Sequence, residues 1–303
     1  MKVDSLFALL WHLWLHEPDA ETLKQLRELG AVTAPLHVDV EPAELASAYA
    51  DLFLLNVYPY GTAFTDSWGE LNTAEAQAVA NLYTKYDYHP PELHEVGAPD
   101  HLGLCLGFVA HLEREGNVSE AGVAAFLSNL LSWAPVCCFA AERDPSAQPF
   151  YRALAALTRE RLLAREWRVT SGDWHHRDPD GEPLNAADET SLRDVVRFLL
   201  VPARCGIFLS RARFGAIANA LGMQLPFGSR FEVCEWLFAS AGESEQVAGL
   251  LQALHAESEA WASAYRTWAS RYPAWQALSA PWLARAAIMQ RTLCAMQEQA
   301  ELA

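Results

Sequence analysis

The sequence predicts an all-α protein. In most segments apolar residues recur with the 3.6-residue period of amphipathic helices, and few segments show the period of two that is typical of strands. Signals for helix starts also recur along the chain. With 303 residues, 51% hydrophobic composition and 11 tryptophans, the chain is long and apolar enough to bury a sizeable core, which excludes a mostly disordered protein.

The first helix is expected close to the N-terminus, where apolar residues recur at helical spacing from Leu6 to Trp14. This segment has the apolar character of a signal-peptide core. However, Asp4 disrupts the basic region that precedes such a core, His12 and His16 interrupt it, and no small-residue cleavage site follows. We therefore expect a helix of the folded protein here.

Local start signals place several of the later helices. Pro18 and Pro42 follow acidic residues at expected helix starts. The patterns Asn72-x-x-Glu75, Asn117-x-x-Glu120 and Ser229-x-x-Glu232 each put a capping side chain three residues before an acid. The expected helices span residues 4–16, 18–29, 41–56, 73–86, 99–114, 118–133, 147–167, 188–199, 209–221, 229–241, 244–271 and 274–299.

Two irregular stretches divide the chain. Residues 87–98 contain Pro90 and Pro91, which stop a helix, and residues 169–187 are polar and rich in turn formers. The sequence thus predicts a helical domain over 1–168, a loop or linker over 169–187, and a helical C-terminal region over 188–303 packed on the first. In that last region four tryptophans at seven-residue spacing predict an aromatic core stripe, with a peptide groove as the alternative: Trp261, Trp268, Trp275 and Trp282.

The net charge of −16 argues against non-specific nucleic-acid binding, which needs basic side chains. Residues 1–150 carry 21 acidic and 6 basic side chains, whereas residues 151–303 carry 17 and 16. The acidity of the first half serves solubility or attracts a basic partner. No uninterrupted apolar stretch is long enough to predict a membrane span. Six dispersed cysteines without a CxxC pair predict free thiols in a reducing cytoplasm.

No sequence pattern predicts a metal site, a cofactor or catalysis. His12 and His16 have metal-ligand spacing but no third ligand accompanies them, and His175-His176 with nearby aspartates is an alternative whose geometry the loop leaves unspecified. Phosphate-binding glycine loops and nucleophile motifs are absent. Pro99-Asp100-His101-Leu102 predicts a helix start with a polar tip, while a catalytic Asp/His pair is the competing interpretation.

Four further segments stand out together, in this order: Tyr49-Ala50-Asp51-Leu52-Phe53 with the later Tyr58-Pro59-Tyr60, Pro99-Asp100-His101-Leu102-Gly103-x-x-Leu106-x-Phe108, Phe126-Leu127-x-x-x-Leu131-x-Trp133-Ala134-Pro135, and Pro149-Phe150-Tyr151-x-x-Leu154-Ala155. They resemble, in the same order, motifs of the TorD/DmsD/NarJ group of redox-enzyme maturation chaperones. The resemblance covers about residues 45 to 167. The C-terminal region, including residues 205–211 and Leu221-Gly222, resembles an extension found in longer members.

The chain also departs from the family pattern. Cys105 and Gly107 stand where acids often follow the PDHLG segment, and Asn129 or Leu130 replaces a histidine. Gly97-Ala98 precedes Pro99 where an acid is common, although Glu95 is close. Ligand contacts that depend on those acids are therefore not implied for this chain.

The resemblance implies a TorD-like helical bundle with an added C-terminal region, and a cytoplasmic chaperone that is not an enzyme. Its partners would be the twin-arginine leader and the apo-form of a molybdoenzyme catalytic subunit, and the family also allows a homodimer. We expect one groove in which carboxylates face the arginines and aromatic walls hold the apolar part. It would comprise Asp51, Tyr58, Tyr60, Trp68, Glu95, Pro99, Asp100, His101 and Phe108. The alternatives are a helical scaffold or regulator, and a metal- or nucleotide-dependent hydrolase.

Overall fold

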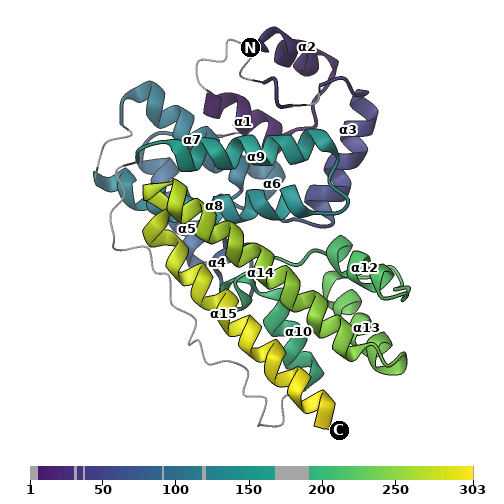
Figure 1. Cartoon of the computed structure of the whole chain (residues 1–303). Coiled ribbons are helices and arrows are strands. Elements are labelled where there is room, and N and C mark those ends of the chain that lie inside the picture. The colour runs from purple at the N-terminus through teal and green to yellow at the C-terminus, as the bar shows by residue number, and fades with distance from the viewer. Residues whose placement is uncertain are drawn as a thin grey trace. The chain divides into compact units, whose positions relative to one another are not determined.

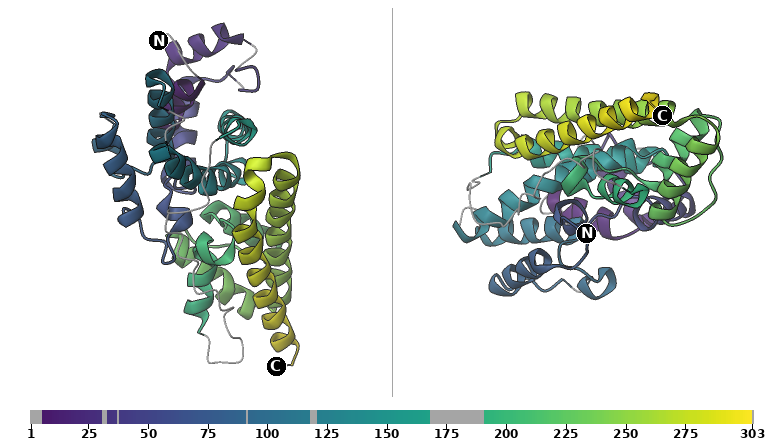
Figure 2. Two further views of the ribbon diagram at one scale, coloured as in Figure 1. Left: turned by 90° about the vertical axis from the view of Figure 1, so that its left-hand side faces the viewer. Right: turned by 90° about the horizontal axis from the view of Figure 1, so that it is seen from below.

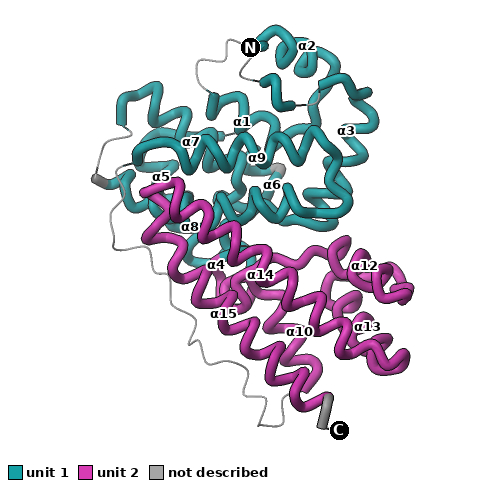
Figure 3. The backbone as a smooth tube through the Cα atoms, in the orientation of Figure 1, with its two compact units in different colours: residues 1–64, 70–175 teal, residues 65–69, 176–303 magenta. Residues whose placement is uncertain are grey.

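The computed structural model describes residues 6–30, 33–36, 38–90, 92–117, 121–167 and 191–302. Every regular element in these ranges is helical, so the all-α prediction is confirmed. The chain forms two compact units, one from residues 1–64 and 70–175 and the other from residues 65–69 and 176–303 (Figure 3). The expected linker, 169–187, lies outside the described residues.

The first unit is a bundle of short and medium helices around two longer ones, α8 and α9 (Figure 1). Its elements are α1 (Leu6–Leu15), α2 (Ala20–Glu28), α3 (Pro42–Tyr49), the π-helical turn η2 (Ala50–Leu54), α4 (Thr62–Thr65), α5 (Ala74–Lys85), α6 (Leu93–Val96), α7 (Leu102–Glu115), α8 (Ala121–Arg143) and α9 (Pro149–Ala164).

Helices α1 and α7 pack closely because α7 presents two glycines four residues apart on one face. A Cβ atom on Gly103 would lie 2.6 Å from Leu15 Cγ, and a Cβ atom on Gly107 would lie 3.0 Å from the Trp11 ring and 2.3 Å from the Tyr88 hydroxyl. The first helix is thereby buried along its Leu10, Leu13 and Trp14 face, as its apolar spacing predicts.

The structure corrects two expected helix ends. The helix predicted over 41–56 changes at Ala50 into a π-helical turn, closed by a bond from the Val57 amide to the Leu52 carbonyl of 2.7 Å. The helix predicted to end at 133 runs through Pro135 to Arg143. Proline removes one backbone bond there, but the apolar run on both sides stays buried, and this packing outweighs the local preference.

Helix α8 is also long and apolar enough, over Gly122–Arg143, to cross a membrane by length and composition. Most of that window is buried inside the protein itself, which is typical of the core helix of a bundle. The few polar residues in this segment therefore do not lower its mean hydropathy below that of a membrane-spanning helix.

The structure confirms one of the three expected capping patterns and shifts the cap of another by one residue. Ser229 and Glu232 form the expected capping box. Thr73, rather than Asn72, is the cap residue of α5, and Asn72 adopts a positive φ of 58°. The acid of the Asn117 pattern, Glu120, lies outside the described residues.

The second unit is built around two long antiparallel helices, α14 and α15, which lie side by side in both views of Figure 2. Tyr265 lies at the centre of the tryptophan stripe, with ring centroids 5.7–6.3 Å from each of its four members, all of which are buried. The predicted aromatic core is thus present. The elements are α10 (Leu192–Leu200), α11 (Pro202–Cys205), α12 (Arg211–Ala220), α13 (Arg230–Glu243), α14 (Val247–Arg271) and α15 (Pro273–Leu302).

Residues 65–69 belong to the second unit although they interrupt the first in sequence. Arg204 of α11 explains this: its Nε donates to the Ser67 carbonyl at 2.7 Å, and its guanidinium lies 4.4 Å from the Trp68 ring centroid. No local sequence pattern indicates such a long-range attachment.

Candidate functional site

A hydrogen-bonded turn, Pro99–Leu102, precedes α7 in the first unit and pairs with the loop Tyr58–Thr62. The Leu102 amide donates to the Pro59 carbonyl at 2.7 Å, and the Gly61 amide donates to the Asp100 carbonyl at 3.0 Å. These bonds make the isolated antiparallel bridge between Tyr60 and His101. This pairing delays the start of α7 to Leu102, three residues later than predicted.

The Asp100 carboxylate holds the loop Tyr58–Thr62 in place through Thr62. Oδ2 accepts hydrogen bonds from the Thr62 amide at 2.7 Å and from the Thr62 hydroxyl at 2.8 Å, at the first residue of α4. The residue is 4% exposed, and burial raises the pKa of the carboxyl although the Thr62 bonds oppose that shift. Oδ1 is buried without a partner among the described residues.

His101 is the cap residue of α7. Its Nδ1 accepts from the Gly103 amide at 3.1 Å, so the neutral ring carries its proton on Nε2. The residue is 3% exposed, and burial lowers its pKa to about 3. The ring packs edge-on against Tyr60 with centroids 5.0 Å apart. Asp100 and His101 therefore form a helix start with a polar tip and do not face each other as an acid–base pair.

Two further residues hold this arrangement and were not singled out from the sequence. The Tyr83 hydroxyl of α5 donates to the Pro99 carbonyl at 2.8 Å, and its ring packs against Phe108. Gly61 lies against Trp133 so closely that a Cβ atom there would be 2.9 Å from the indole. Only the spatial neighbours reveal these roles, since neither residue lies in a recognisable local pattern.

An exposed surface lies just before this loop, at the end of η2. Leu54 and Leu55 are 63% and 42% exposed, and the half-buried Asp51 precedes them by one helical turn. The Asn56 side chain donates to the Asp51 carbonyl at 2.9 Å and to the Ser146 hydroxyl at 3.3 Å, which anchors the turn. We call Asp51, Leu54, Leu55, Tyr58 and Tyr60 the η2 surface.

The nine expected site residues fall into four groups. Pro99, Asp100, His101 and Phe108 are buried and form the support, whereas Asp51, Tyr58 and Tyr60 are half-buried, with the Tyr60 hydroxyl donating to the Val96 carbonyl at 2.9 Å. Glu95 lies on α6, and its side chain is outside the description. Trp68 belongs to the second unit and is exposed.

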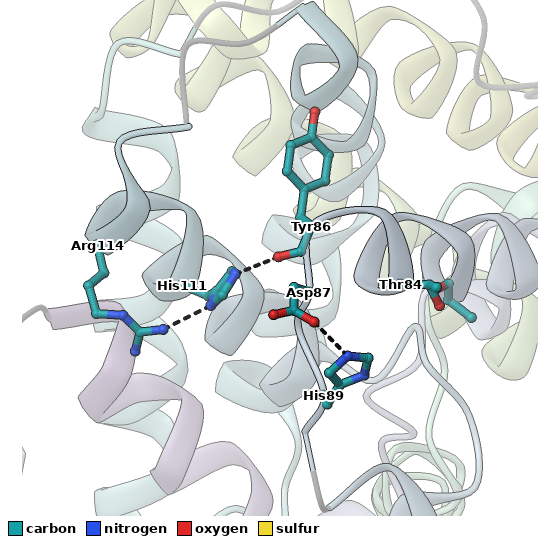
Figure 4. Close-up of polar contacts among 7 residues, drawn as sticks. Thr84, Tyr86, Asp87, His89, His111 and Arg114 are labelled. Carbon is teal, nitrogen blue, oxygen red and sulfur yellow. Dashed lines mark hydrogen bonds and ion pairs between the residues drawn. The ribbon is translucent and has the colours of Figure 1, made fainter.

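One histidine elsewhere in the first unit, His111, links two helices. His111 Nε2 lies 2.8 Å from the Tyr86 carbonyl, and its Nδ1 lies 3.0 Å from an Arg114 nitrogen (Figure 4). Because arginine can only donate, Nδ1 is the acceptor and Nε2 donates to the carbonyl, which links α7 to the end of α5. His89 pairs separately with Asp87 at 2.9 Å.

The His12–His16 pair acquires an acidic neighbour that the sequence does not indicate. Glu92 comes within 3.8 Å of His16 Nε2, and the two imidazole rings lie 4.9 Å apart. Within the described ranges, no group of three or more potential ligands is arranged to hold a metal ion. His175 and His176 lie outside those ranges.

The described cysteines are free thiols, and five are buried. Burial raises the pKa of Cys205 to about 11 and of Cys234 to about 12. These thiols are accordingly protonated near neutral pH and pack as small apolar side chains, as predicted for Cys137-Cys138.

Fold and site together define an all-helical protein in which a buried turn before α7 supports an aromatic loop and an exposed acid-and-leucine surface. Residues 15–138, less than half of the chain, match the family model of the nitrate reductase delta subunit, which describes NarJ/TorD-type redox-enzyme maturation chaperones. The family is one of chaperones rather than enzymes, and its members bind molybdoenzyme catalytic subunits. No curated protein and no solved structure matches the chain.

Proposed function

We propose that this protein is a cytoplasmic, system-specific chaperone for a molybdenum-cofactor oxidoreductase. It binds the twin-arginine leader or the apo catalytic subunit, assists cofactor insertion before export, and carries out no chemical step itself. The family match over residues 15–138 supports the chaperone class, and the η2 surface supports the mode of binding.

The observation that carries the leader assignment is the composition of the η2 surface. A twin-arginine leader presents two guanidinium groups followed by an apolar stretch, and its binding site should offer a carboxylate beside exposed apolar side chains. Asp51 lies one turn before Leu54 and Leu55, the two exposed leucines of this segment. Bidentate pairing of a guanidinium with the Asp51 carboxylate would orient the leader, and the leucines would cover its apolar part.

The buried turn has a supporting role in this proposal. Asp100 and His101 are too buried to meet a ligand directly, but their bonds to Thr62 and Gly103 hold the loop that carries Tyr58 and Tyr60. The excess of acids in residues 1–150 adds a long-range attraction for a basic leader.

The test is titration of a synthetic leader with two consecutive arginines and an apolar stretch against the full chain. Asp51→Asn combined with Leu54→Ser should weaken binding by about tenfold or more, because a charge-assisted bond and an apolar contact are lost together. Glu28→Gln, on an exposed residue of α2, is the matched control and should bind as the wild type does. Equal affinity of the double variant and the wild type would refute the η2 assignment.

A further inference from the structure

The segment that opens the second unit has a charge opposite to that of the rest of the chain. Residues 191–230 contain six arginines and a single acid, Asp194, in a protein of net charge −16. Asp194 is itself engaged, since its carboxylate and the Ser191 hydroxyl form the capping box of α10. Asp194 also attracts Arg193 and Arg197, but one carboxylate cannot balance six guanidinium groups, so most of the basic charge of this segment is not neutralised from within.

Three of the six arginines have roles inside the unit. Arg213 pairs with Glu257 at 3.1 Å, Arg230 donates to the Leu209 carbonyl, and Arg204 holds residues 67 and 68. The other three do not form an ion pair with any carboxylate of the described residues. They are Arg193 and Arg197, four residues apart on the exposed face of α10, and Arg211 at the start of α12.

Aromatic rings accompany two of these three arginines, one ring exposed and the other half-buried. Phe227 is 81% exposed, and the Arg211 guanidinium lies 4.4 Å from its ring centroid. Phe231 lies 5.9 Å from the guanidinium of Arg193. The two phenylalanines flank the start of α13, which packs against both α10 and α12 (Figure 1). An exposed ring held under a cation is typical of an interaction surface.

We infer that Arg193, Arg197, Arg211, Phe227 and Phe231, the arginine–phenylalanine surface, dock an acidic segment of a partner protein that also carries apolar side chains. Carboxylates would pair with the free guanidinium groups, and apolar side chains would cover the rings. The leader is excluded as the occupant because its arginines would be repelled. This inference goes beyond the proposed function and does not depend on it.

Charge at larger distance favours a short protein segment over a long polyanion. A nucleic acid or an anionic membrane extends beyond the local arginines and would be repelled by the rest of the chain, whose net charge is −16. A short acidic segment experiences mainly charges within a Debye length, about 8 Å at physiological salt. The arginine–phenylalanine surface is therefore matched to a peptide.

The test uses a fluorescent peptide of alternating Glu and Phe or Leu residues, and the same peptide with Gln in place of Glu. The full chain should bind the acidic peptide and show at least about tenfold weaker binding to the Gln peptide. Arg193→Gln/Arg197→Gln/Arg211→Gln should lose about tenfold in affinity, and Phe227→Ala should lose severalfold without loss of folding, because the ring is exposed.

The matched control is Arg266→Gln/Arg271→Gln/Arg291→Gln, which removes the same charge from exposed positions on α14 and α15 and should bind as the wild type does. Equal losses in both triple variants, equal binding of the Glu and Gln peptides, or no binding to either would overturn the inference. So would tighter binding to phosphatidylglycerol vesicles or to a single-stranded oligonucleotide than to the acidic peptide. Leader binding should be unchanged in the first triple variant, which separates this test from that of the proposed function.

Discussion

Asp100 and His101 are neighbours in sequence, yet burial moves their pKa values in opposite directions. Desolvation disfavours the charged form of each group, so it raises the pKa of the carboxyl and lowers that of the imidazole to about 3. The sequence pattern of this turn predicted a helix start with a polar tip. It did not indicate that both side chains point inward, because burial depends on Tyr60, Thr62 and Tyr83, which come from other elements.

The neutral His101 predicts a specific loss of stability in acid. Its folded pKa of about 3 lies below the unfolded value of about 6.5, so the unfolded state binds more protons between these values. The stabilisation is complete above about pH 6.5 and is lost as pH falls toward 3, at up to about 1.4 kcal/mol per pH unit. The raised pKa of the Asp100 carboxyl has the opposite effect, because above its unfolded pKa the folded state binds more protons than the unfolded state. As pH falls, Asp100 therefore offsets part of the stability that is lost through His101.

Urea unfolding between about pH 7 and pH 4 measures this effect, and the expected result is a shallower pH dependence for His101→Gln than for the wild type. His94→Gln, an exposed histidine of α6, is the control and should follow the wild type. Parallel curves for His101→Gln and the wild type would show that His101 is not held neutral.

Among the elements, those set by local chemistry were predicted and those set by packing were not. The Ser229–Glu232 capping box and the apolar face of α1 follow from spacing alone. By contrast, the passage of α8 through Pro135 depends on the buried surroundings of that helix. The attachment of residues 65–69 to α11 depends on Arg204, which is distant in sequence.

The α1–α7 contact gives a prediction at this scale. Gly107→Ala should destabilise the protein by about 1–3 kcal/mol, because the added methyl group would collide with Trp11 and the Tyr88 hydroxyl. Gly215→Ala is the matched control in α12, where a Cβ atom meets nothing within 4 Å, and it should stabilise by about 0.5–1 kcal/mol through helix propensity. Thermal unfolding followed by circular dichroism measures both, and a stabilised Gly107→Ala would contradict the close packing.

For the whole molecule, the charge distribution separates two kinds of surface. Residues 1–150 carry 21 acids against 6 basic residues, whereas residues 191–230 carry six arginines against one acid. Comparing the net charge of the two halves of the sequence predicts the acidic region. It does not reveal the basic segment, because acids elsewhere in the C-terminal half balance its arginines. Together the two surfaces suit a chaperone that contacts a basic leader and an acidic protein segment at separate places.

The proposed function requires that the full chain recognise the arginines of a twin-arginine leader. Isothermal titration with a leader peptide, and with the same peptide carrying Gln in place of both arginines, tests it most directly. We expect saturable binding of the arginine peptide and at least about tenfold weaker binding of the Gln peptide. Binding of the arginine peptide should also weaken when salt rises from about 0.05 to 0.3 M. Equal affinities for the two peptides, or an affinity for the arginine peptide that ignores salt, would contradict it.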